Sequence, residues 1–231
     1  MLSATPTDGG AMRLLLTSAG ITNPTIRGAL DGLLGKPVEE CAALAIPTAG
    51  YGYAGGTRRA WNFIAGRGTS CPMTELGWGS LGVLELSTLP SLGIERWLPE
   101  VKAADVLLVN GGDPLYLSYW MRESGLADVL AELDVVWVGF SAGSMVMTPR
   151  IGEEFVGWRP PSGDDHTLGM VDFSIFPHLD HPDLPENTMA AADHWATALG
   201  NHAYAIDDQT AIVVNGSAVE VVSEGNWRLY E

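Results

Sequence analysis

The chain has 231 residues, 46% of them hydrophobic, and its 28 acidic and 12 basic residues give a net charge of −16. This charge argues against nucleic-acid binding, which needs a basic surface to displace counterions from phosphates, and against docking on anionic membranes. No apolar run approaches the roughly 20 residues that span a bilayer. With no signal-peptide pattern at its start, the sequence predicts a cytoplasmic protein with a flexible extension, residues 1–11, and a single domain, residues 12–231.

Apolar runs of strand length alternate with helix-compatible segments along most of the chain. The first run, residues 13–17, is followed by Asn23 and Pro24, which suit a helix N-cap and first turn, and Gly35 suits the end of that helix. Further strands are expected at residues 41–47, 82–87, 106–110 and 135–140, and further helices at residues 58–65, 94–104, 115–123 and 126–133. This alternation predicts an α/β fold, with a mostly parallel sheet and helices on both faces.

The end of the chain follows a different pattern. Residues 211–215 and 218–223 are apolar runs joined by an Asn-Gly turn, which predicts an antiparallel hairpin. One more antiparallel strand is expected at residues 227–230, and a helix is expected over residues 185–199. The sequence therefore predicts a C-terminal antiparallel hairpin appended to the parallel sheet.

A Gly-x-Ser-x-Gly pentapeptide occupies residues 139–143, at the end of the apolar run 135–140. This is the setting of a nucleophile elbow, a sharp strand-to-helix turn that exposes a serine at the edge of the sheet. The glycines permit the turn, and the N-terminus of the following helix offers N–H groups to a developing oxyanion. Ser141 is therefore the candidate nucleophile. A plain strand-to-helix turn with a capping serine is the alternative interpretation.

An oxyanion hole needs two N–H donors, and one of them is expected from Ala142, the residue after the serine. The second donor must come from a neighbouring strand end. Gly111 and Gly112 follow the apolar run 106–110, and glycine allows the backbone to approach a substrate carbonyl closely. An ordinary glycine-rich turn between a strand and a helix is the alternative.

A serine hydroxyl needs a base that takes its proton, and the chain has five histidines. His178 comes just after an apolar run, at an expected strand end, where ligand sites gather in open α/β folds. It is therefore the candidate base. Together with Asp180, His181 and Asp183 it could instead form a metal site, although His-x-x-His is a short spacing for a known zinc pattern.

Three motifs follow one another along the chain: GGDP at residues 111–114, GFSAGSMV at residues 139–146 and FPHLDH at residues 176–181. In their order and spacing the sequence resembles the dipeptidase E family of serine peptidases, which includes the cyanophycinases. The resemblance covers most of the chain from Arg13 onward. It implies a fold like that of the class I glutamine amidotransferases, with serine in place of cysteine at the elbow.

By this resemblance Ser141 is the nucleophile, His178 is the base, and Gly112 and Ala142 donate to the oxyanion. The expected chemistry is hydrolysis of short peptides through an acyl-enzyme. It needs no cofactor and no metal. A short peptide is the expected partner, with no role for nucleic acid or membrane, and we expect a monomer or small homo-oligomer.

The resemblance also implies an acidic triad member shortly after the nucleophile helix, where this chain has Glu153 and Glu154. In an extended segment the two side chains point to opposite sides, and the apolar neighbours would bury the side of Glu153. Glu154 is therefore preferred as the residue that orients His178. Glu153 and, as a weaker choice, Asp180 are the alternatives.

The better-known members of the family cleave dipeptides that begin with aspartate, whose carboxylate would need a cation or several donors when buried. Candidate cations are Arg58, Arg59, Arg150 and Arg159. Arg159 and Asp113, which follows the paired glycines, are taken as the substrate-binding candidates. Two other functions stay open: an α/β-hydrolase esterase, and a non-catalytic member of the amidotransferase-like fold that binds a small ligand.

Overall fold

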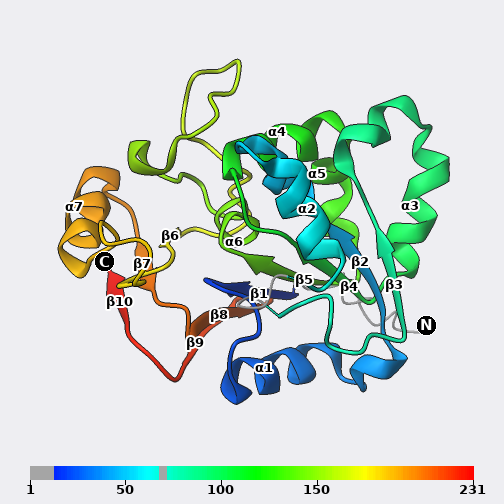
Figure 1. The fold of residues 1–231 in the computed structure, drawn as a ribbon, viewed down its shortest axis with the longest axis horizontal. Coiled ribbons are helices and arrows are strands. Elements are labelled where there is room, and N and C mark those ends of the chain that lie inside the picture. Colours follow the sequence, from blue (N-terminus) through cyan, green and yellow to red (C-terminus); the bar gives the residue numbers. More distant parts are fainter. Residues whose placement is uncertain (1–12, 68–71) are drawn as a thin grey trace, which may run out of the picture.

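The structure of the protein is a computed structural model, and it describes residues 13–67 and 72–231. The expected N-terminal extension, residues 1–11, lies outside the described residues. Two sheets and the helices around them make up the described chain (Figure 1). Within these residues, no helix combines the length and the apolar character needed to cross a membrane.

A seven-stranded sheet forms the centre of the fold, with the strand order β3-β2-β4-β5-β1-β8-β9. Strands β1 to β5 run parallel to one another, whereas β8 and β9 are antiparallel additions. The bounds are β1 Arg13–Thr17, β2 Ala42–Ile46, β3 Ser80–Val83, β4 Val106–Val109, β5 Val136–Phe140, β8 Thr210–Asn215 and β9 Ala218–Ser223. The predicted mostly parallel sheet and the C-terminal hairpin are both confirmed.

Helices cover both faces of this sheet, with α1 on one face and α3, α4 and α5 on the other (Figure 1). The bounds are α1 Pro24–Leu34, α2 Gly56–Ile64, α3 Ile94–Ala103, α4 Pro114–Glu123, α5 Leu126–Val129, α6 Ala142–Met145 and α7 Met189–Leu199. The first helix has the predicted caps: Asn23 accepts the N–H of Ile26, and Gly35 ends the helix with a φ of 67°.

The two faces of the sheet bury separate apolar cores, and the residues of one strand divide between them. Leu14 and Leu16 of β1 belong to the core shared with α4, whereas Leu15 belongs to the core shared with α1. Successive residues in a strand point to opposite faces, so a strand that is apolar at every position is buried on both. Burying each leucine contributes about 1.5–3 kcal/mol. This packing makes the end of β1 a rigid support for the residues that follow it.

One expected strand is shorter in the structure. The sequence predicts a strand over residues 82–87, but β3 ends at Val83 and a 3₁₀ helix occupies Leu86–Ser91. Glu85 accepts the N–H of Ser87, and the N–H of Leu86 donates to Thr48 Oγ1. Such bonds between side chains and the backbone compete with the strand ladder and end it.

The second sheet has three strands, in the order β10-β7-β6. Strands β6 (Ser174–Phe176) and β7 (Ala203–Ile206) are parallel, and β10 (Trp227–Tyr230) pairs antiparallel with β7. The strand predicted at residues 227–230 therefore exists, but it joins this sheet. The buried ring of Trp195 in α7 lies 5.5 Å from that of Phe176 and packs the helix against the sheet.

The second sheet matters for function because of where its strands end. Strand β6 ends two residues before His178, and β7 is followed directly by Asp207 and Asp208. Both strands are parallel, so both ends lie at the same edge. From there the chain enters β8, which pairs with β1 of the main sheet. The connection between β7 and β8 therefore carries acidic residues to the carboxyl end of β1.

Candidate active site

Ser141 lies at the sharp turn between β5 and α6, with a φ of 50° and a ψ of −106°. A positive φ is uncommon for a residue that carries a side chain, and strain of this kind clusters at functional sites. The backbone N–H of Ser141 donates to the carbonyl oxygen of Thr17 over 3.0 Å, at the end of the neighbouring strand β1. The surrounding packing therefore holds the strained residue in place.

The two glycines around Ser141 are required by close approaches of the backbone. A β-carbon on Gly139 would collide with the carbonyl of Gly143, and one on Gly143 would collide with the carbonyl of Val109 in β4. The indole Nε1 of Trp137 donates to the carbonyl of Gly143 over 2.8 Å and fixes the turn from the core side. The pattern Gly-x-Ser-x-Gly is thus a steric requirement of this turn.

Two N–H groups near Ser141 are free to bind an anion. Gly112 follows β4, the strand beside β5, and has a φ of 144° where a β-carbon would collide with the carbonyl of Ala49. Within the described part of the chain, neither the N–H of Gly112 nor that of Ala142 donates a hydrogen bond. Both remain candidates for the oxyanion hole, and Gly111 lines the cavity beside them.

His178 is held by a carboxylate that the sequence analysis did not identify. Its Nδ1 lies 2.8 Å from Oδ1 of Asp208, and the two side chains are 19% and 26% exposed. Ser18, a fully buried residue after β1, joins the pair. Its Oγ accepts the backbone N–H of His178 and donates to Oδ1 of Asp208, both over 2.7 Å. With Nδ1 turned to the carboxylate, Nε2 of His178 is the nitrogen left for another partner.

The charge of Asp208 is stabilised by its neighbours. Burial raises the pKa of this carboxyl, but the hydrogen bond and charge of His178, with smaller effects from Ser18 and His181, outweigh burial and leave the pKa below its usual value. Nε2 of His181 lies 3.4 Å from Oδ2 of Asp208, so two histidines share one carboxylate. Across the described chain, no group of three or more His, Cys, Asp or Glu residues is arranged to hold a metal ion.

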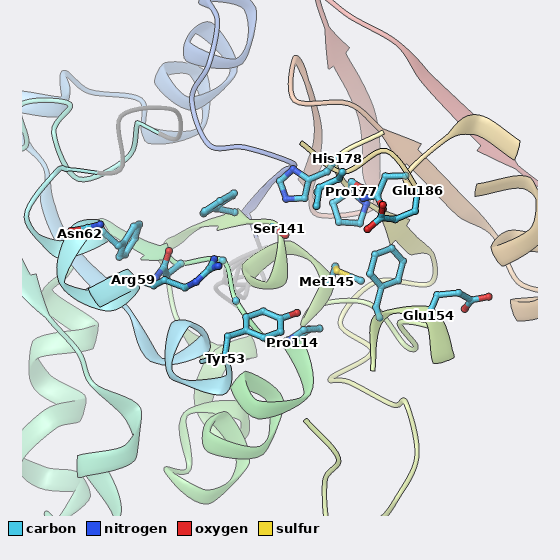
Figure 2. A pocket seen from close by; sticks show the side chains of 18 of the residues that line it. Tyr53, Arg59, Asn62, Pro114, Ser141, Met145, Glu154, Pro177, His178 and Glu186 are labelled. Carbon is cyan, nitrogen blue, oxygen red and sulfur yellow. Dashed lines mark hydrogen bonds between the residues drawn. The ribbon is translucent and has the colours of Figure 1, made fainter. Parts of the chain in front are cut away.

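The structure brings neither predicted glutamate to His178. Glu153 and Glu154 lie in a single-turn 3₁₀ helix, so the extended geometry assumed for this segment is wrong. Glu153 pairs at the surface with Arg159, the N–O distance being 2.9 Å. Glu154 lines the cavity, but Figure 2 shows its carboxylate directed away from His178. Asp180, the third candidate, is exposed.

Asp208 and Ser18 were missed because no local motif marks them. Asp208 is adjacent to Asp207, between the short run Ala203–Ile206 and β8, and that short run was not recognised as a strand. Recognising it would have placed an acidic pair at a strand end, which is where ligand sites of α/β folds gather. Ser18 is equally hard to find, since it is one serine after an apolar strand.

Asp113 has a structural role at the start of α4. It is fully buried, and its Oδ1 caps α4 by accepting the N–H groups of Leu115 and Tyr116. Its Oδ2 accepts the N–H of Trp158 over 2.6 Å. Asp113 does not line the cavity that holds Ser141, and its predicted role in substrate binding stays a prediction. Arg159, the other predicted substrate-binding residue, pairs with Glu153 and does not line the cavity, so its role also stays a prediction.

We expect Asp113→Ala to lower the free energy of unfolding by about 2–4 kcal/mol. The substitution removes a helix cap, worth about 1 kcal/mol, and leaves the N–H of Trp158 without an acceptor, which costs about 1–3 kcal/mol. Asp113→Asn keeps the helix cap and should lower the free energy of unfolding by less. Denaturant titration of the three proteins measures the effect, and an unchanged stability with a raised KM would return Asp113 to the substrate site.

The same carboxyl gives a pH test. Burial, the dominant influence, raises the pKa of Asp113 in spite of the three N–H donors. A raised pKa in the folded state favours folding below the ordinary value near 3.9, and that contribution is lost as the pH rises through the higher folded value. The stability of the wild type relative to Asp113→Asn should therefore decline as the pH rises from about 4.

Ser141 and His178 line one cavity of about 600 Å³ (Figure 2). This volume lies within the range of about 300–1,000 Å³ that is typical of sites for small ligands. The apolar part of the wall is formed by Phe63, Pro114, Phe140, Met145, Phe155, Pro177 and Leu184. The charged side chains at the wall, apart from the histidine, are Arg59, Glu75, Glu154 and Glu186.

A parallel sheet with a strained serine at a strand-to-helix turn, opposite a histidine bound to a carboxylate, is an arrangement typical of serine hydrolases. The family comparison narrows this class. Residues 14–222 match the model of Peptidase family S51. The chain therefore belongs to this family of serine peptidases, and the predicted relation to dipeptidase E is confirmed.

Two solved structures share the fold. A protein from Listeria monocytogenes EGD-e, described as a candidate peptidase E, has a TM-score of 0.68 and 18% identity, and the match covers 94% of this chain and 100% of that one. A peptidase from an acI-B1 Actinobacterium has a TM-score of 0.66 and 18% identity, with 95% and 90% covered. At these identities the likeness concerns the fold alone. No curated protein matches the chain.

Proposed function

We propose that the protein is a peptidase for short peptides, with Ser141 as nucleophile, His178 as general base and Asp208 as the carboxylate that orients it. The main support is the contact between Asp208 and His178, because His178 lines the same cavity as Ser141. A carboxylate at Nδ1 sets the tautomer in which Nε2 can accept a proton, and it stabilises the imidazolium that forms.

In the proposed reaction, His178 takes the proton of the Ser141 hydroxyl as its oxygen attacks the scissile carbonyl. The N–H groups of Gly112 and Ala142 hold the oxyanion, and the loss of one such donor typically costs about 10²–10³ in rate. His178 then protonates the leaving amine, and water repeats the cycle on the acyl-enzyme. Ser18 is a positioning residue in this scheme, because it contacts His178 and Asp208 and not the substrate.

The preference for short peptides is supported by the shape of the site. The cavity of about 600 Å³ is of small-molecule size, and the peptide would have to enter it for its carbonyl to reach Ser141. A folded protein cannot supply so short a segment without local unfolding. We therefore expect dipeptides and tripeptides to be cleaved, and folded proteins to be left intact.

The test is hydrolysis of a panel of dipeptides that includes Asp-X peptides, with Ser141→Ala as the control. Release of free amino acids by the wild type, and none by the variant, supports the proposal. Labelling of Ser141 by a fluorophosphonate tests the nucleophile independently of the substrate. If no peptide is cleaved and the serine is not labelled, a non-catalytic role in ligand binding becomes the better interpretation.

A further inference from the structure

A tight turn after β6 brings His178 and His181 to the same carboxylate. The backbone N–H of His181 donates to the carbonyl oxygen of His178 over 3.3 Å and closes the turn. Leu179, between them, is buried, and its N–H donates to the carbonyl oxygen of Ile206, the last residue of β7. The turn is therefore fixed to the strand that leads into Asp208. Both imidazole rings reach this carboxylate, and their centroids lie 5.9 Å apart.

The tautomer of neutral His181 is set by the backbone of its own loop. Nδ1 of His181 accepts the N–H of Asp183 over 3.1 Å, so this nitrogen carries no proton when the ring is neutral. The single ring proton is then on Nε2, which lies 3.4 Å from Oδ2 of Asp208. Neutral His181 therefore presents a donor to this oxygen.

The two oxygens of Asp208 have different partners. Oδ1 lies 2.8 Å from Nδ1 of His178 and accepts the hydroxyl of Ser18. Among the described residues, His181 has the one side chain that contacts Oδ2. A carboxylate held through one oxygen can still turn about its Cβ–Cγ bond, because the torsion there is broad. The contact at Oδ2 opposes this rotation and keeps Oδ1 at His178.

Rotation of the carboxylate matters because a second acceptor lies close to His178. Oγ of Ser18 is 3.4 Å from Nδ1 of His178, so it can take over the ring proton if Oδ1 of Asp208 moves away. Hydrogen bonds to an ionised acceptor are roughly twice as strong as those to a neutral one, so a hydroxyl stabilises the imidazolium less than a carboxylate does. The position of Oδ1 therefore determines how well His178 serves as a base.

We propose that His181 is a positioning residue, whose Nε2–H holds Oδ2 of Asp208 and thereby keeps Oδ1 directed at His178. This proposal rests on the function proposed above and adds a residue that acts on its orienting carboxylate. His181 does not line the cavity, so its effect on the substrate is indirect. The side chains of His181 and Asp208 are 28% and 26% exposed, so water can replace part of the contact. The effect is therefore smaller than that of losing Asp208.

The kinetic test compares His181→Phe, His181→Gln and His194→Phe with the wild type on a cleaved dipeptide. Phenylalanine keeps a ring beside His178 but has no N–H, so kcat of His181→Phe should fall about tenfold while KM stays within about twofold. Glutamine offers an amide N–H to Oδ2, so His181→Gln should recover most of the loss. His194 is exposed in α7, and His194→Phe should keep both constants within about twofold.

Nuclear magnetic resonance of the enzyme without substrate separates this inference from the proposed function. Long-range ¹H–¹⁵N correlations, recorded at a pH where both rings are neutral, show which nitrogen of each histidine carries the proton. In the wild type we expect His178 to carry it on Nδ1 and His181 on Nε2. In His181→Phe part of the His178 population should move its proton to Nε2, and His181→Gln should resemble the wild type.

These tautomers support the positioning role even if the wild type cleaves no peptide, in which case the peptidase proposal alone fails. A wild-type His181 with its proton on Nδ1 overturns the role of this residue without the use of any variant. The same follows if folded His181→Phe keeps both kcat and the His178 tautomer of the wild type. A folded His181→Gln that loses as much as His181→Phe also overturns it, because the donor would then be irrelevant.

Discussion

Replacing Ser141 with alanine is expected to abolish turnover, with kcat falling by about 10⁶, the loss seen when the serine of a well-studied triad is removed. The residue makes no side-chain hydrogen bond to the described chain, so its hydroxyl is not needed for folding. Purified Ser141→Ala should therefore unfold at the same denaturant concentration as the wild type. Activity within tenfold of the wild type in a sample free of wild-type protein would contradict the proposed nucleophile.

Ser141→Gly provides a matched variant, because it removes the hydroxyl and also relieves the backbone. With a φ of 50° and a ψ of −106°, a side chain at this position is strained, and such positions cost of order 1–3 kcal/mol. The Ser141→Gly protein should be as inactive as Ser141→Ala, but its free energy of unfolding should exceed that of the wild type by about 1 kcal/mol. A glycine variant that is less stable than the alanine variant would show that the turn is not strained.

The region around Ser141 could be predicted from the sequence because its determinants are local. The strand Val136–Phe140 is apolar throughout, and the glycines at 139 and 143 report the close backbone contacts that the structure contains. The same holds for the turn after β4, where Gly112 has a positive φ. In each case one short segment contains both the strand and the turn that exposes the functional group, either the Ser141 side chain or the N–H of Gly112.

The carboxylate at His178 could not be predicted in this way because its position depends on pairing between distant segments. Asp208 is 30 residues from His178, and Ser18 is 160 residues from it. They meet because β6 and β7 form a separate sheet, and because β8 returns to pair with β1. The expectation for Glu154 depended on a locally extended chain, which the 3₁₀ helix replaces.

Asp113 shows a different limit of sequence reasoning. Its place after paired glycines is equally typical of a ligand-binding turn and of a helix cap. The choice between them depends on Trp158, which comes from a loop far along the chain and uses the second carboxylate oxygen. With that bond the residue holds the loop against α4, which is a structural role that its local sequence does not reveal.

Asp208→Asn is expected to lower kcat by about 10⁴, the loss that follows the same substitution in the best-studied triad. An asparagine can turn its amide nitrogen toward Nδ1 of His178, which favours the tautomer with a proton on Nε2, and that nitrogen then cannot accept the serine proton. The KM should change by less than tenfold, because Asp208 is placed behind the histidine. Steady-state kinetics on the cleaved dipeptide measure both constants.

Glu154→Gln is the matched control, since it makes the same change from carboxylate to amide at the residue that the sequence favoured. It should keep kcat within about twofold, because the carboxylate of Glu154 is directed away from His178 (Figure 2). A larger loss of kcat in Glu154→Gln than in Asp208→Asn would give the orienting role to Glu154.

The stability of Asp208→Asn is a second readout. Because the pKa of Asp208 is lowered in the folded protein, the ionised carboxylate stabilises the fold above the ordinary pKa near 3.9. The stability difference between the wild type and Asp208→Asn should therefore be present at neutral pH and disappear as the pH falls through the lowered pKa.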